Sequence, residues 1–155
     1  GDAILVHTED SMFKFSGSNT IQSSDGEIQP TETNVFDTGV SEVFGSDFGF
    51  AGLQYKNDHI VTENGYIFFD RDSRIVYMYS GQGQIVKLSD SIEKLFRHRP
   101  IENIRFANDY YNNRFFMSIL FYEDYITTED GKEVIKQRYY PVTLSFNFTT
   151  EVVSN

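Results

Sequence analysis

Runs of β-branched and aromatic residues, separated by short polar or glycine-rich breaks, dominate the middle of the chain. Three such runs cover residues 65–70, 75–79 and 84–88, and the breaks between them fall at residues 71–74 and 81–83. Short breaks between runs of this kind are typical of β-hairpins. The pattern therefore predicts a three-stranded antiparallel meander over residues 65–88.

Further strands are predicted on both sides of the meander. They cover residues 3–15 as a hairpin, 53–61 with a turn at residues 57–58, 101–111, 114–122, 133–147 and 149–153. Asn residues in 111–113 and the Asp-Gly pair in 129–132 predict tight turns. Pro141 is expected to bend or break its strand, because proline cannot donate to a β-ladder. Residues 17–33 are polar and predict a long loop.

One short helix is predicted from residue 91 to residue 98. Asp90 and Glu93 have the spacing of a capping box, and apolar residues recur at i, i+3 and i+4 from Ile92. Pro100 follows the basic last turn and ends the helix. This is the only helix that the pattern supports.

A weak internal repeat suggests how the strands are arranged. Residues 65–79 and 113–147 each pair an aromatic strand with a second one, and the later unit carries an inserted hairpin near residues 122–137. Such units fit the blades of a β-propeller. The predicted fold class is all-β with one short helix, built from partial β-propeller-like antiparallel blades, with a β-sandwich as the alternative. Residues 1–155 are expected to form a single β domain from a larger protein.

Composition narrows the classes of partner. The 155 residues include 13 Lys+Arg and 23 Asp+Glu, a formal net charge of −10. This charge repels phosphate groups, so specific nucleic-acid binding is not expected, although DNA can pass an acidic surface without sticking. The absence of Cys excludes a disulfide framework. No apolar run reaches the roughly 20 residues of a membrane helix and no signal peptide is visible, so no membrane partner is expected.

No catalytic, cofactor-binding or metal-binding residue is predicted. Asp70 and Asp72 flank Arg71 at a tight turn, where Asp is common for local hydrogen bonding, and the Gly and Glu of an EF-hand loop are missing. The three histidines, His7, His59 and His98, lack the spacing of metal ligands. Walker A, dinucleotide-binding and serine-nucleophile motifs are absent. A glycosidase carboxylate pair stays an alternative in so acidic a chain, though nothing singles out two residues.

A segment rich in Gly and Phe is the candidate interaction surface. Its residues are Phe44, Phe48, Gly49, Phe50 and Gly52. Glycine at this density favours tight bends and close backbone contact over regular structure. The segment is therefore predicted to pack on a neighbouring element or on a partner protein.

Four stretches resemble a known group of proteins. They are Gly-Ser-Asp-Phe-Gly-Phe-Ala-Gly (45–52), Asn-Gly-Tyr-Ile-Phe-Phe-Asp-Arg-Asp (64–72), Asp-Tyr-Tyr-Asn-Asn-Arg-Phe-Phe (109–116) and Thr-Leu-Ser-Phe-Asn (143–147). Together they are similar to tail and neck proteins of tailed bacteriophages, in particular the propeller-bearing nozzle, muzzle or stabilisation proteins of crAss-like podoviruses. The similarity spans residues 40–153, and those proteins are much longer than this chain.

The resemblance implies a non-enzymatic virion structural module, made in the bacterial host cytoplasm and located in the tail or neck around the DNA exit channel. Its expected partners are other virion proteins or copies of itself, and the family offers no catalytic residues. The alternatives are a carbohydrate- or receptor-binding β domain and a glycosidase-like propeller fragment. Sugar sites often use Trp, and the chain has none, although it has 15 Phe and 10 Tyr.

Overall fold

The computed structural model describes residues 3–16, 40–43, 51–80, 83–89, 93–96 and 99–148. The described chain is mostly β-strand, with three antiparallel sheets and one short α-helix, which confirms the predicted all-β class with one short helix. It divides into two compact units, Gly1–Gln54 and Tyr55–Asn155. The predicted loop at residues 17–33 and the predicted strand at 149–153 lie outside the described residues.

The first unit contains a three-stranded sheet. Strands β1 (Ala3–His7), β2 (Met12–Ser16) and β3 (Val40–Glu42) lie in that order. The predicted hairpin is confirmed, and β3 extends it by pairing Phe13 with Glu42. In the turn, the Thr8 amide donates to the Ser11 carbonyl at 2.8 Å, and the Ser11 amide donates to the Thr8 hydroxyl at 3.0 Å. These bonds satisfy backbone groups of the turn that are not paired between β1 and β2.

The second unit begins with a four-stranded meander. Its strands are β4 (His59–Thr62), β5 (Gly65–Asp70), β6 (Ile75–Tyr79) and β7 (Ile85–Lys87), in sequence order. The predicted meander is confirmed and gains β4 at its edge. The Asp70 carboxylate accepts hydrogen bonds from the amides of Asp72 and Ser73, at 3.0 and 3.3 Å. This bonding makes Asp70 a turn-forming residue, as its position predicts.

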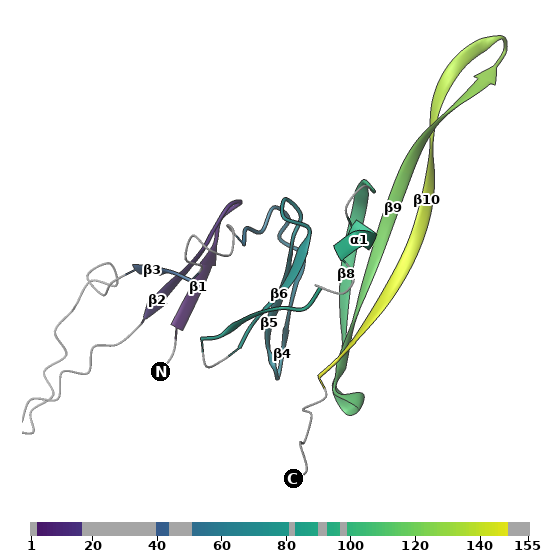
Figure 1. Ribbon diagram of the computed structural model, residues 1–155. Helices are drawn as coiled ribbons and strands as arrows, with labels where there is room; N and C mark the ends of the chain where they lie inside the picture. Colours follow the sequence, from purple (N-terminus) through teal and green to yellow (C-terminus); the bar gives the residue numbers. More distant parts are fainter. Residues whose placement is uncertain are drawn as a thin grey trace, which may run out of the picture. The chain divides into compact units, whose positions relative to one another are not determined.

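The second sheet of this unit carries the longest strands. Strands β8 (Ile101–Asp109), β9 (Arg114–Glu129) and β10 (Lys132–Asn147) form a sheet with β9 in the centre (Figure 1). The predicted end of a strand at residue 122 is wrong, because β9 continues to Glu129. Of the two effects predicted at Pro141, a bend or a break, the break does not occur, since Pro141 pairs with Leu120 in unbroken register. A proline fits there because β10 is an edge strand. The backbone nitrogen of Pro141 faces away from β9, so no hydrogen bond between β9 and β10 depends on an amide at this position.

The turn between β8 and β9 is held by one carboxylate. Asp109 precedes a short 3₁₀-helix, η1 (Tyr110–Asn112), and accepts hydrogen bonds from the Asn112 side chain at 2.8 Å and from Arg114 Nε at 2.8 Å. These bonds, that from Asn112 first, hold the pKa of Asp109 below its usual value. Asn113 follows with φ of 50°, in the left-handed region that Asn tolerates. The predicted turn at residues 111–113 is confirmed.

One apolar core joins the two sheets of the second unit. Its buried members come from β5, β6, α1 (Glu93–Phe96), β8 and β9: Ile67, Phe69, Val76, Phe96, Ile104, Phe115, Met117, Ile119 and Phe121. The helix contributes Phe96, whose ring lies 5.2 Å from that of Phe69, and Arg74 Nη1 donates to the carbonyls of Phe96 and Arg99. Two antiparallel sheets sharing one core are typical of a sandwich. The arrangement of propeller blades stays a prediction.

Candidate functional site

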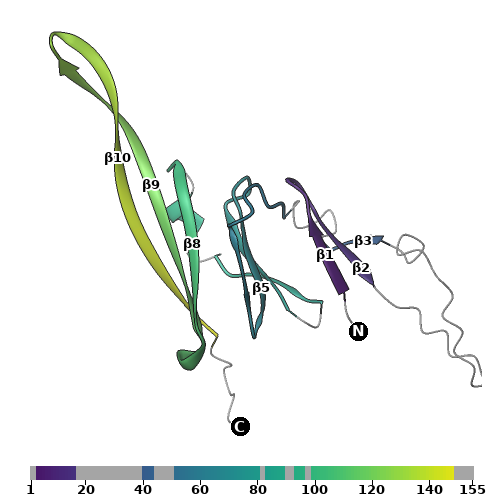
Figure 2. The same cartoon turned by 180° about the vertical axis from the view of Figure 1, so that it is seen from behind.

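β9 and β10 continue beyond β8 as a two-stranded arm. β8 pairs with β9 as far as Ile101 opposite Phe121, whereas β9 and β10 stay paired to Glu129 opposite Lys132. We define the arm as residues 122–139. Figures 1 and 2 show it as a twisted ribbon that runs past the end of β8. Beyond Tyr122, whose amide donates to the Pro100 carbonyl, neither strand of the arm has a further neighbouring strand among the described residues, so both present an open edge.

A two-residue turn fixes the register of the arm. Asp130 has φ of 49° and Gly131 has φ of 75°, the left-handed pair that a type I′ turn requires. This turn closes on a hydrogen-bonded pair, here Glu129 and Lys132. The amide and carbonyl groups of Glu129 and Lys132 therefore point toward the partner strand. Those of the next residue on each strand, Thr128 and Glu133, point away from it, and the two directions alternate along the rest of the hairpin.

The arm exposes large apolar side chains in a regular arrangement. Ile126 and Ile135 lie directly opposite each other on the two strands, and they are 68% and 73% exposed. Tyr139, opposite Tyr122, is 47% exposed. Two strands alone cannot bury such residues, because an isolated hairpin has no second layer. Exposed apolar side chains grouped in this way are typical of contact surfaces.

The two strands of the arm carry opposite charge. The β9 side, residues 122–129, holds three carboxylates and no basic residue, whereas the β10 side, residues 132–139, holds three basic residues and one Glu. Lys136 forms an ion pair with Glu129 across the hairpin. Arg138 lies over the Tyr125 ring at 4.9 Å. The arm is thus an element with one acidic edge and one basic edge.

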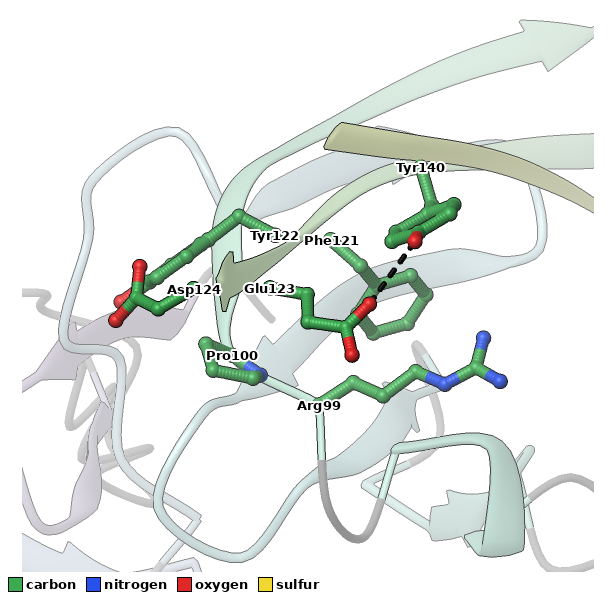
Figure 3. Close-up of a pocket in the computed structure, with 7 residues that line it drawn as sticks. All are labelled: Arg99, Pro100, Phe121, Tyr122, Glu123, Asp124 and Tyr140. Carbon is green, nitrogen blue, oxygen red and sulfur yellow. Dashed lines mark hydrogen bonds between the residues drawn. The ribbon is translucent and has the colours of Figure 1, made fainter. Parts of the chain in front are cut away.

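A cavity of about 510 Å³ lies where the arm leaves the sheet (Figure 3). Its lining residues are Arg99, Pro100, Phe121, Tyr122, Glu123, Asp124 and Tyr140. The Tyr140 hydroxyl donates to Glu123 Oε2 at 2.9 Å, and the Tyr122 amide donates to the Pro100 carbonyl at 3.1 Å. Arg99 lies 5.9 Å from the centre of the Phe121 ring. The cavity thus combines aromatic rings with groups of both charges.

The two carboxylates of this cavity are neighbours on one strand. Figure 3 shows Glu123 on the same side of β9 as Phe121, and Asp124 on the side of Tyr122. Successive side chains of a strand point to opposite faces. Glu123 and Asp124 therefore do not face each other across a bound sugar, as the acid and base of a glycosidase do.

The predicted interaction residues are only partly described. Phe44, Phe48, Gly49 and Phe50 lie outside the described residues. Gly52 is buried, and a Cβ built on it lies 1.7 Å from the backbone oxygen of Glu9. The segment after Gly52 is bonded to the β1–β2 turn, since the Leu53 amide donates to the Thr8 carbonyl at 2.9 Å. Gly52 thus packs on a neighbouring element of its own unit.

Replacing Gly52 with alanine is expected to destabilise the first unit by about 1–3 kcal/mol, because the backbone near Glu9 has to move. Hydrogen exchange read by mass spectrometry should show faster exchange in β1 and β2. Gly131→Ala is the matched control, since its added Cβ meets no atom within 4 Å and the strain falls in the arm. Unchanged protection of β1 and β2 in Gly52→Ala would contradict the packing.

Two residues considered in the sequence as part of possible metal sites, Arg71 and His59, form contacts within the fold. Arg71 forms a buried ion pair with Asp58, and His59 packs against the Tyr66 ring at 5.5 Å. His98 lies outside the described residues. Within the described ranges, no group of three or more His, Asp or Glu side chains is placed to hold a metal ion. None of the helices in the described part of the chain has the length and apolar character to cross a membrane.

Sequence reasoning found the hairpin near residues 122–137 but did not single out the arm as a surface. The available signal was local: Ile126 and Ile135 stand in a mostly polar stretch, on either side of an Asp-Gly turn and equally far from it. Equal distance from a two-residue turn places two residues opposite each other. Two large aliphatic residues that face each other in a mostly polar hairpin indicate a surface contact.

Comparison of the chain with models of known protein families, with curated proteins and with solved structures finds no match.

Proposed function

We propose that this chain is a non-enzymatic structural module of a large assembly, and that the arm is the element through which it contacts other chains. The observation that carries this proposal is the two-stranded ribbon itself, with open edges and with Ile126 and Ile135 largely exposed. Open edges and exposed apolar pairs are costly for a chain that works alone. Contact with another chain removes both costs.

The resemblance to phage tail and neck proteins supplies the setting of this proposal. In that setting the chain is a virion protein near the DNA exit channel, and its partners are other virion proteins or further copies of itself. The net charge of −10 supports the setting, because an acidic wall does not hold passing DNA. We also propose that the sheets of this chain are blades of a propeller that closes into a ring within the larger protein.

Immuno-electron microscopy tests the setting. An antibody raised against the purified chain is applied to purified tailed particles whose genome encodes the chain. Labelling at one fixed level of the tail or neck is expected. Particles that carry no label, with the chain present only in cell extracts, would contradict a virion role.

Shortening the arm tests its part in assembly. Deleting residues 124–129 and 132–137 keeps the Asp130-Gly131 turn and closes it on Glu123 and Arg138, which already pair. The core of the second unit should keep its melting temperature, because the deleted pairs lie outside it. Incorporation of the shortened chain into particles is expected to fall at least tenfold against the full-length chain. Equal incorporation would show that the arm is not the contact element.

A second candidate is a carbohydrate-binding domain, and the cavity at the base of the arm favours it. The Tyr140 ring is available for stacking, and Glu123, which accepts from the Tyr140 hydroxyl, offers an acceptor for sugar hydroxyls on the same face. A glycan array separates the two candidates. Binding of one glycan class that is lost in Glu123→Gln and Tyr140→Phe supports the sugar site, whereas an array without signal supports the structural module.

A further inference from the structure

We propose that the arm's partner is the arm of a second copy of this chain, with the β10 edge of one copy pairing with the β9 edge of the next. This inference rests on the proposed function and names the partner of the same surface. Its product is an antiparallel sheet that runs from copy to copy. The contact joins two different edges, so it builds a ring or an open filament of copies rather than a closed pair.

The charges of the two edges are complementary. The β9 side of the arm carries Glu123, Asp124 and Glu129 and no basic residue, while the β10 side carries Lys132, Lys136 and Arg138. Two arms placed side by side in the same direction bring a basic edge against an acidic one. Opposite charges across neighbouring strands stabilise a sheet, and like charges destabilise it. Pairing β10 with a second β10 would instead set basic residues against each other.

The register of the hairpin also fits pairing between copies. A copy shifted sideways without stagger repeats the pairing inside the hairpin, where Arg138 faces Glu123 and Lys132 faces Glu129. The same shift sets Ile135 of one copy beside Ile126 of the next. Alternating Ile126 and Ile135 side chains then form one continuous row, in which each side chain of the most exposed apolar pair packs against its lateral neighbours.

The outward backbone groups of the two edges match as well. Glu129 and Lys132 close the turn and bond inward, so Ile126, Ile135 and their i±2 neighbours direct their amide and carbonyl groups outward. At zero stagger these outward residues face outward residues of the next copy. The hydrogen-bonding pattern of an antiparallel sheet therefore continues across the contact without a shift.

Pro141 sets the lower limit of the contact. It lies two residues beyond Tyr139, an outward position, and therefore offers no amide at the β10 edge. Proline at an edge is a common means of preventing strand pairing. The edge is thus closed at the base of the arm and open along residues 132–139.

Charge reversal on each edge tests the pairing. The β9-reversed chain carries Glu123→Lys, Asp124→Lys and Glu129→Lys, and the β10-reversed chain carries Lys132→Glu, Lys136→Glu and Arg138→Glu. Light scattering over a concentration series at low salt is expected to show a growing mass for the parent chain, and at least a tenfold weaker association for each reversed chain. The chain reversed on both edges, and an equimolar mixture of the two single-edge reversals, are expected to associate again.

A proline variant separates loss of contact from loss of folding. Single-edge reversal also sets like charges opposite each other within the hairpin, so recovery in the mixture is the informative result. Gln137→Pro removes one outward amide, as Pro141 does in the parent chain, and leaves the inward ladder in place. It is expected to abolish association while hydrogen exchange within the hairpin stays slow.

Two results would overturn the proposal. The first is a parent chain that keeps the monomer mass at every concentration and salt. The second is a β9-reversed chain that associates as the parent does. If the parent stays monomeric and the shortened arm still prevents incorporation into particles, the self-pairing is wrong and the proposed function stands. If the arm can be shortened without effect on incorporation while the parent self-associates through its edges, the self-pairing stands and the proposed function of the arm is wrong.

Discussion

Replacing Asp58 with alanine is expected to lower the free energy of unfolding of the second unit by about 3–5 kcal/mol. The Asp58 side chain is 2% exposed, and its two oxygens lie 2.5 Å from Arg71 Nε and 3.2 Å from Arg71 Nη2. Removing the carboxylate takes the ion-pair partner away from a guanidinium side chain that is only 14% exposed. A buried charge that has lost its counter-charge is among the costliest defects in a folded protein.

The Asp58–Arg71 pair also holds several elements together. Arg71 Nη1 donates to the Ile101 carbonyl at 3.3 Å, at the start of β8, and the guanidinium lies 3.9 Å from the centre of the Tyr55 ring. The Asp58 carbonyl accepts from the Phe69 amide at 2.9 Å, on β5. Loss of the carboxylate therefore affects both sheets of the unit.

Urea unfolding followed by far-ultraviolet circular dichroism measures the effect, since the chain has no Trp for fluorescence. Asp124→Ala removes an exposed carboxylate from the arm and is expected to change the stability by about 0.5 kcal/mol or less. The double replacement Asp58→Leu with Arg71→Met should be less destabilising than Asp58→Ala, because no charge stays buried. If Asp58→Ala and Asp124→Ala unfold alike, the pair has no structural role.

Replacing Phe115 with alanine is expected to cost about 3–5 kcal/mol of stability. The Phe115 ring is fully buried and stacks on Phe146 at 4.6 Å, with an angle of 2° between the ring planes. Its centre lies 5.3 Å from that of Phe148 and 6.2 Å from that of Phe106. The alanine variant loses these contacts and leaves a cavity among three strands.

Phe116 provides a matched control for Phe115. It is the next residue on β9, has the same side chain and points to the opposite face, where the Arg114 guanidinium lies 4.9 Å from its ring centre. Phe116→Ala is expected to cost about 1 kcal/mol, because the side chain is only partly buried. The two variants are compared by their urea midpoints. Equal midpoints would show that the face of β9, and hence the core, is assigned wrongly.

The sequence was most informative where structure depends on neighbouring residues. The Asp-Gly pair at residues 130–131 indicates a two-residue hairpin because both positions need positive φ, and Asn113 marks a turn for a similar reason. The meander and the first hairpin follow from runs of β-branched and aromatic residues. These elements were predicted with nearly their observed bounds, and the meander gained β4 in the structure.

Strand length in the arm was harder to predict. Residues 123–129 are mostly polar, and β9 continues through them because backbone hydrogen bonds to β10 need no apolar side chain. Alternation of apolar and polar residues arises only where one face of a sheet is buried. The arm is exposed on both faces of its ribbon, so this signal is absent. The effect of Pro141 was hard to predict for a related reason. A proline interrupts a central strand but is tolerated in an edge strand, and the sequence does not show which of the two β10 is.

The candidate site shows the same division. The opposite charges of residues 122–129 and 132–139 can be read from the chain. They become two exposed edges only because β8 pairs with β9 no further than Ile101 opposite Phe121. The cavity at the base of the arm gathers Arg99 and Tyr140, which lie far apart in the sequence. Neither feature has a local pattern that sequence reasoning can find.

By itself, the sequence determined the all-β class, the turns, the short helix and the acidic charge, because these follow from local backbone preferences and from composition. Only the tertiary structure decided that Asp58 meets Arg71, that Phe115 lies inside while Phe116 does not, and that the arm has two free edges of opposite charge. Those features depend on which strands become neighbours. That choice is made by the packing of the whole unit, where contacts between residues distant in sequence outweigh local preference.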